Sequence, residues 1–205
     1  RFRYRVNIGY TLIVCKSNCN KLRKFSMDST YQEISNLLSR YYNADTPNAD
    51  RKKIENYLEK FSSQIDSCKL CLNFLKITSD IYMHMFALSV MENTLNRRWH
   101  TLSKINKNLI KTELYDMIFQ NSYSLTPTIS KKLCKIFALI CRNEYPEEFP
   151  EFFKIIEQSI ANAHTFYPAL TILDYLLEEL FNENSFILSS RKKLLIAICK
   201  EKCPP

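Results

Sequence analysis

Apolar side chains recur along this chain every three to four residues, which is the spacing of an amphipathic α-helix. The segment 47–63 shows the pattern plainly, because Ile54, Leu58 and Phe61 share one face and charged residues fill the other. The same spacing, bounded by Thr-Pro and Tyr-Pro pairs that favour helix starts, predicts a succession of helices. The predicted helices cover residues 29–43, 47–63, 66–78, 80–98, 103–121, 127–143, 146–163, 168–182 and 189–202.

The predicted helices form pairs that begin at a nearly constant interval, close to residues 28, 66, 103 and 146. A two-helix unit that repeats roughly every 40 residues is typical of HEAT repeats. Connections of a few residues predict antiparallel neighbours. We therefore expect an all-α superhelix, a HEAT-repeat solenoid of about four and a half helix pairs. A closed helical bundle is the structural alternative.

The predicted helix over residues 168–182 is apolar nearly all round. Such a helix is usually buried, so we expect it in an inner position, covered on both sides.

Glycine is almost missing from the sequence: the 205 residues contain one, Gly9, where an average chain would have roughly 14. Glycine-rich dinucleotide and phosphate loops need two or three glycines, so both are excluded. Tight β-hairpins also depend on glycine, which argues against a β-sandwich or barrel. The hydrophobic share of 46% excludes a disordered chain.

The formal charge of +8 is concentrated at the N-terminus. Residues 1–26 contain seven basic side chains and no acid, which leaves 22 basic and 21 acidic residues in 27–205. We expect residues 1–26 to be a basic extension outside the fold, with a functional basic arm as the alternative. Residues 27–205 would form the repeat segment, truncated from a longer protein. The balanced charge of that segment argues against nucleic acid as a partner, and no membrane partner is expected.

Cysteine and histidine do not form a recognisable catalytic or metal motif. Cys68-x-x-Cys71 lacks the second pair that a zinc site requires, so we expect the eight cysteines to act as small buried residues. His84, His100 and His164 belong to no hydrolase motif. No enzyme activity, cofactor or metal is expected, although a cysteine–histidine enzyme stays open as an alternative because such pairs meet only in space.

Four segments resemble the N-terminal region of the exportin branch of the importin-β (karyopherin) superfamily. The clearest is Phe86–Trp99, F-A-L-S-V-M-E-N-T-L-N-R-R-W, which is similar to the F-A-L-x-x-x-E-N-x-I-x-x-x-W pattern of exportins. Lys132–Ile136 followed by Glu144–Pro146 resembles the family's K-L pair and later D/E-W-P, with tyrosine in place of tryptophan. Asp50–Phe61 and Leu177–Leu180 resemble further family segments.

Within this branch, Gln64-Ile65, Cys71-Leu72 and Lys132–Lys135 are most similar to the exportin-six subfamily. The resemblance covers about residues 29–200. It implies a nuclear export receptor that shuttles between nucleus and cytoplasm. The implied partners are Ran in its GTP state, a protein cargo such as profilin–actin, and nuclear pore proteins.

The resemblance also implies that the second helix of each pair lines the inner, partner-binding face. The charged and polar residues that we expect there are Lys52, Lys53, Glu92, Asn96, Arg97, Lys131, Lys132 and Lys135. A solvated surface is the simpler interpretation of each of these charges. Phe86 and Trp99 are expected in the core between repeats, and Glu92 and Asn93 could also have a structural role.

Three alternatives to a Ran-dependent export receptor stay open. The chain could be a HEAT scaffold that does not depend on Ran, or an import receptor of the same superfamily. It could also be a carrier of nucleic acid, which the balanced charge of residues 27–205 disfavours.

Overall fold

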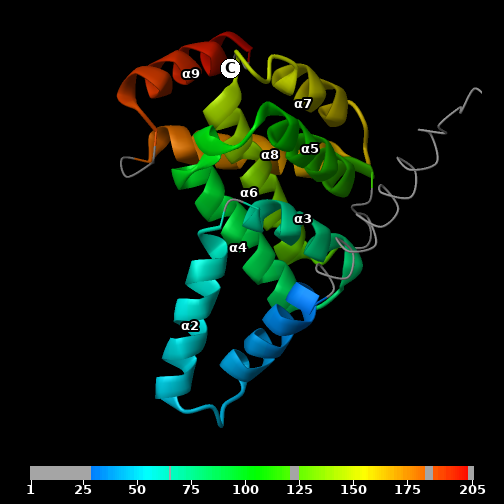
Figure 1. The fold of residues 1–205 in the computed structure, drawn as a ribbon. Coiled ribbons are helices and arrows are strands. Elements are labelled where there is room, and N and C mark those ends of the chain that lie inside the picture. Colours follow the sequence, from blue (N-terminus) through cyan, green and yellow to red (C-terminus); the bar gives the residue numbers. More distant parts are fainter. Residues whose placement is uncertain (1–28, 65, 121–124, 183–186, 203–205) are drawn as a thin grey trace, which may run out of the picture. The chain divides into compact units, whose positions relative to one another are not determined.

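The computed structural model describes residues 29–64, 66–120, 125–182 and 187–202 (Figure 1). Every regular element in these ranges is helical, which confirms the all-α prediction. The chain divides into two compact units, one up to Phe61 and one from Ser62 onward. The predicted basic extension, residues 1–26, lies outside the described residues.

The first unit is a helical hairpin made of a helix over residues 29–42 and α2 (Asn48–Ser62). The hydroxyl of Tyr41 donates a hydrogen bond to Glu55 Oε1 at 3.0 Å and ties the two helices together. Arg51 Nη2 closes the connection by donating to the carbonyl oxygens of Asn43 and Ala44 at 2.9 and 3.1 Å. These contacts explain why the short connection gives antiparallel helices.

The second unit contains three further helix pairs and a last helix (Figure 1). The elements, in order, are α3 (Ser67–Ile77), α4 (Ile81–Arg97), η1 (Trp99–Thr101), α5 (Lys104–Tyr115), η2 (Asp116–Gln120), α6 (Pro127–Glu144), α7 (Phe152–Ile160), α8 (Phe166–Phe181) and α9 (Ser189–Lys202). The element η2 is a π-helical turn that continues α5.

The pairs of the second unit stack in two layers. Helices α4, α6 and α8 pack against one another in that order, and α3, α5 and α7 each pack on the helix that follows them in sequence. This is the arrangement expected of stacked HEAT-type pairs, so the repeat prediction is confirmed. The second helices of the pairs form one continuous layer, and the candidate site lies on it.

The most enclosed helix of the described ranges is α6. Every residue from Ile136 to Arg142 is buried, whereas α8 exposes Leu170, Leu177 and Phe181. The expected inner position of α8 is found in part, because α8 packs against α6, α7 and α9 but keeps an exposed face. Composition reports only how apolar a helix is. Helix α6 has neighbours in both directions of the layer and in the other layer. Although α8 is the more apolar helix, no helix in the described ranges is long and apolar enough to cross a bilayer.

Helix α7 begins later than predicted, at Phe152 instead of residue 146. Residues 145–151 form turns, in which the Glu148 amide donates to the Glu144 carbonyl at 2.9 Å. Pro150 explains the difference, because proline has no amide hydrogen and disfavours a helical conformation at the residue before it. Pro150 therefore delays the start of α7.

The other proline boundaries agree closely with the sequence. Thr126 and Pro127 are the N-cap and first residue of α6, as predicted. Helix α2 begins at Asn48, directly after Pro47. Pro168 is the third residue of α8, still within the first turn, where no amide hydrogen is needed.

Candidate partner-binding face

Glu92 of α4 lies between two lysines of α6. Its carboxylate forms an ion pair with Lys135 Nζ at 2.8 Å and a second with Lys132 Nζ at 3.3 Å. Lys132 also donates a hydrogen bond to Ser89 Oγ at 3.2 Å. These four residues, the Glu92 cluster, join the two helices at the surface of the layer. The two α6 lysines lie three residues apart, so both reach the same side of the helix.

Electrostatics keeps Glu92 ionised although its side chain is only 22% exposed. Burial acts to raise the pKa of Glu92, but the hydrogen bonds and positive charges of Lys135 and Lys132 outweigh it, and the pKa is lowered overall. The hydrogen bond to Glu92 raises the pKa of Lys135 against the opposing effect of burial. Each partner therefore stabilises the charged form of the other.

A surface hollow of about 370 Å³ surrounds this cluster. We call it the Glu92 hollow; its lining residues are Glu92, Pro127, Thr128, Lys131, Lys132, Lys135 and Tyr175. Lys131 is exposed, and Tyr175 contributes an aromatic side chain from α8. Four of the eight predicted site residues thus meet in one place on the α4–α6–α8 layer.

The other four predicted residues do not line the hollow. Asn96 and Arg97 lie at the end of α4, and Arg97 is exposed. Lys52 and Lys53 are exposed on α2, in the other compact unit. Lys53 forms an ion pair with Asp50 at 3.0 Å, which holds the pKa of that carboxyl below its usual value.

Asn96 belongs to a polar ladder that connects all three helices of the layer. Arg142 of α6 donates to Asn96 Oδ1 at 2.8 Å and pairs with Glu179 of α8 at 2.7 Å. The Arg142 side chain is 1% exposed, so this charge is fully enclosed and depends on both partners. The side-chain oxygen of half-buried Asn96 is therefore engaged within the layer, where it joins α4 to α6.

A second arginine extends the ladder to the last helix. Arg191 of α9 donates to the carbonyl of Arg142 at 3.2 Å and to the carbonyl of Tyr145. It also forms an ion pair with Glu147 at 2.8 Å. Helix α9 is thereby held at the C-terminal end of α6.

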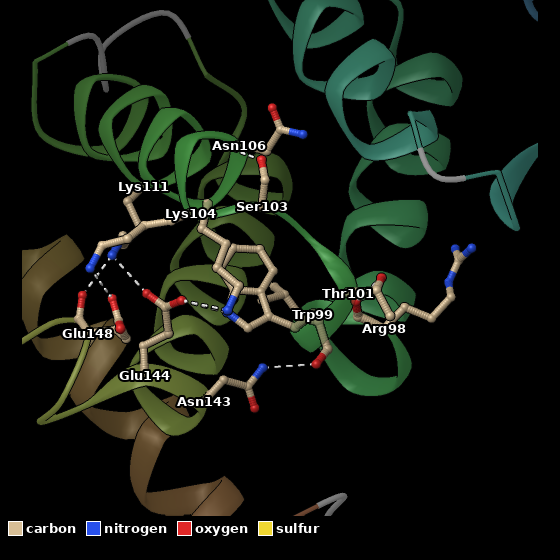
Figure 2. Close-up of polar contacts among 12 residues, drawn as sticks. Arg98, Trp99, Thr101, Ser103, Lys104, Asn106, Lys111, Asn143, Glu144 and Glu148 are labelled. Atoms are coloured by element: carbon tan, nitrogen blue, oxygen red, sulfur yellow. Dashed lines mark hydrogen bonds and ion pairs between the residues drawn. The ribbon is translucent and has the colours of Figure 1, made fainter.

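Figure 2 shows a buried cluster at the same end of α6, centred on Glu144. Glu144 accepts a hydrogen bond from Trp99 Nε1 at 3.0 Å and pairs with Lys111 at 2.7 Å and Lys107 at 3.3 Å. Lys111 also donates to the carbonyl of Glu148 at 2.8 Å. These four side chains, Glu144, Trp99, Lys107 and Lys111, form the Glu144 cluster.

The Glu144 cluster explains two of the motifs that carried the family resemblance. Trp99 ends the Phe86–Trp99 segment and Glu144 begins the Glu-Tyr-Pro segment, and the two are joined by a buried hydrogen bond. Trp99 is buried, as predicted for a core position. Glu92 also has a structural contact, as the sequence allowed, because its ion pairs join α4 to α6.

The cysteines in the described ranges are buried or half-buried free thiols. Burial raises the pKa of Cys68 and of Cys134 to about 12, and the pKa values of Cys71 and Cys141 are also well above the usual range. Thiols of this kind are poor nucleophiles at neutral pH. Within the part of the chain that is described, no group of three or more potential metal-binding side chains is found.

Sequence reasoning missed Arg142, Tyr175 and Glu179. A signal was available in the helical register. Arg142 follows Lys135 by seven residues, which is two helical turns, and Tyr175 precedes Glu179 by four. Each helix of the layer therefore has polar residues on one face at helical spacing, and a search for such stripes would have found all three.

Comparison with known proteins gives two adjacent family matches. Residues 54–120 match the Importin-beta N-terminal domain, and residues 126–203 match the Exportin 1-like protein family. The first match ends with η2, and the second begins directly before α6.

Individual relatives point the same way. Exportin-6-A of Xenopus laevis is 28% identical over 179 residues, which covers 87% of this chain and 16% of the relative. Exportin-6 of Homo sapiens is 29% identical over 170 residues, 83% of this chain and 15% of the relative. Exportin-T of Mus musculus is 29% identical over 115 residues, 52% of this chain and 12% of the relative.

The stacked helix pairs and the two matches define the class, a HEAT-type helical-repeat chain similar to the N-terminal repeats of the importin-β superfamily. Within that superfamily, the chain is similar to the N-terminal region of the exportin branch, and its most similar relatives named here are exportin-6 proteins. It spans about one sixth of the length of the exportin-6 relatives, 16% for the Xenopus laevis protein.

Proposed function

We propose that this chain is the N-terminal segment of a nuclear export receptor that binds Ran in its GTP state and takes part in the export of a protein cargo. The observation that carries the proposal is the adjacent pair of family matches, at residues 54–120 and 126–203, on a stack of HEAT-type pairs. The likeness to exportin-6 relatives makes profilin–actin the candidate cargo. Shuttling between nucleus and cytoplasm and contact with nuclear pore proteins belong to the same proposal.

The structure supports a binding role through the layer formed by α4, α6 and α8. Its polar residues are fixed by contacts between helices, and the Glu92 hollow leaves Lys131 exposed. Charged groups held in place in this way lose little conformational freedom when a partner binds. In this proposal the chain acts as a binding protein and not as an enzyme, because its function needs only surfaces that recognise partners.

Coupling between the two partners follows from linkage. If Ran–GTP and cargo favour the same curvature of the stack, each raises the affinity of the other by the same factor. The Asn96–Arg142–Glu179 ladder is suited to transmit a change of curvature, because it connects three successive helices through one buried guanidinium.

The test is a binding assay with purified chain and Ran loaded with GTP or GDP. The expected result is binding to Ran–GTP that exceeds binding to Ran–GDP. Replacing Lys131 by Glu should weaken it, whereas replacing Lys154 by Glu on α7 should not, because Lys154 is exposed in the other layer. Equal binding to both nucleotide forms, or none to either, favours the alternative of a HEAT scaffold that does not depend on Ran.

An import receptor is distinguished by the effect of cargo. An export receptor binds Ran–GTP more tightly when cargo is present, whereas an import receptor releases cargo when Ran–GTP binds. Titrating profilin–actin into the Ran–GTP complex therefore separates the two by the sign of the coupling.

A further inference from the structure

We propose that the Glu92 hollow binds an acidic segment of a protein partner, and that Glu92 in the free chain occupies the place of one partner carboxylate. This rests on the proposed function, in which the α4–α6–α8 layer binds proteins, and it adds the chemistry of what is bound. It also changes the role expected of Glu92, which does not contact the partner but occupies the lysines that the partner would bind. Glu92 competes with the partner.

The charge of the hollow favours an anion. Its lining contains three lysines and a single carboxylate. Pro127 and Thr128 line it too, and they are the first two residues of α6, whose first turn contains no acidic side chain. The N-terminal end of a helix carries a partial positive charge, so it adds to the field of the lysines.

The contacts of Glu92 define what a partner must do. Lys132 and Lys135 are both held by Glu92, at 3.3 and 2.8 Å, while Lys131 is exposed. An approaching carboxylate can meet Lys131 first and then share or replace the contacts of Glu92 with the other two lysines. The hollow therefore exists before a partner binds, but Glu92 neutralises part of its positive charge.

The same features favour carboxylates over nucleic acid. The one arginine of α6, Arg142, is buried and engaged by Glu179, so it is not available for bidentate phosphate contacts. The carboxylate of Glu179 also acts on Lys135 electrostatically. Beyond residue 26 the sequence has 22 basic against 21 acidic residues, which does not provide the extended basic face that a polynucleotide needs.

The experiment measures fluorescence anisotropy of a fluorescein-labelled poly-glutamate peptide titrated with the 205-residue chain at low salt. Glu92→Gln keeps the shape of the side chain but removes the competing charge, so binding should tighten about two- to fivefold. The matched control, Glu157→Gln, changes the charge equally on exposed α7 and should leave the affinity close to that of the unchanged chain.

Two lysine variants give the opposite effect. Lys131→Ala and Lys135→Ala should each weaken peptide binding about two- to fivefold, whereas Lys154→Ala on α7 should not. Lys131 is exposed and lies outside the ion pairs of Glu92, so its variant stays informative if replacement of Glu92 disturbs folding. Circular dichroism and urea unfolding of each variant check the fold. Added salt should weaken binding in every case.

Each contrary result has a distinct meaning. The proposal is overturned if Glu92→Gln leaves peptide affinity unchanged or if Glu157→Gln tightens it equally. It is also overturned if a labelled oligouridylate RNA gains as much from Glu92→Gln as the peptide does. A peptide response as described, with no Ran–GTP binding by any variant, supports this inference and counts against the proposed function.

Discussion

The chain contains the same ionic arrangement twice, one glutamate between two lysines, in two very different surroundings. In the Glu92 cluster the two nitrogen–oxygen distances are 2.8 and 3.3 Å, and in the Glu144 cluster they are 2.7 and 3.3 Å. The glutamate side chains are 22% and 2% exposed, respectively. Similar contact geometry therefore occurs at two very different degrees of burial.

The surroundings of Glu144 show how a buried ionic cluster is made tolerable. Besides its two lysines, Glu144 has the indole N–H of Trp99 as a third partner (Figure 2). The ammonium groups of Lys107 and Lys111 lie over the rings of Trp99 and Phe149, 5.6 and 5.1 Å from the ring centres. Each charge thus has several favourable contacts to offset the loss of water. The side chains of the Glu92 cluster keep access to water, so they need fewer protein contacts to offset the loss of hydration.

The largest expected effect is the loss of stability on replacing Glu144 by Ala. This variant leaves two lysines and the Trp99 N–H without their shared acceptor in a buried site, which should lower the free energy of unfolding by about 3–5 kcal/mol. Urea denaturation followed by circular dichroism measures it. Glu157→Ala, an exposed glutamate of α7, is the control and should change stability by less than about 0.5 kcal/mol. A loss at Glu144 no larger than that of the control contradicts a structural role.

A smaller loss is expected from Trp99→Phe. The phenyl ring fills much of the same space but cannot donate to Glu144, so the lost hydrogen bond to a charged group should cost about 1.5–3 kcal/mol. In a double-mutant cycle with Glu144→Gln, the two losses should be less than additive because they remove the same contact. Strict additivity would show that Trp99 stabilises the fold by packing alone.

Replacing Glu92 by Gln should affect stability least of the three. The ion-paired side chains are 22–36% exposed, so the expected loss is below about 1 kcal/mol. Measured alongside Glu144→Gln under identical conditions, it tests directly whether burial separates the two clusters. Comparable losses at the two positions would remove the distinction between a structural and an open cluster.

The pH dependence of the Glu92 contribution has a defined sign. The pKa of Glu92 is lowered from an ordinary value of 4.5, so at acidic pH the unfolded chain binds more protons at this site than the folded chain does. The contribution is complete above pH 4.5 and is lost as the pH falls through the lower pKa of the folded state. The stability difference between the unchanged chain and Glu92→Gln should therefore shrink on acidification. A stability difference that grows on acidification would contradict a lowered pKa of Glu92 in the folded chain.

The sequence predicted the parts of the fold that depend on local pattern. Helical periodicity placed the helices, and Thr126-Pro127 placed the start of α6 correctly. The sequence-based predictions failed where packing against neighbouring helices or a proline determines the structure. Pro150 shifted the start of α7, and the number of packing partners, not the apolar content, made α6 the enclosed helix.

The candidate site shows the same division. The family resemblance placed Glu92, Lys132 and Lys135 on one inner face, and in the structure ion pairs join them. Whether a charge faces solvent or a buried partner depends on the adjacent helix, so the sequence did not separate Asn96, which Arg142 holds in the ladder, from exposed Lys131. A pairwise comparison of the polar positions on two facing helices would predict which charges find a partner and which face solvent.

Hydrogen–deuterium exchange of the chain with Ran–GTP, and with Ran–GDP as the control, tests the central claim most directly. The claim is that partners bind on the layer of α4, α6 and α8, through the open Glu92 hollow and not through the buried Glu144 cluster. The predicted result is slower exchange in α4 and the N-terminal half of α6 with Ran–GTP only. Protection confined to α5 and α7, or the same with both nucleotides, would contradict it.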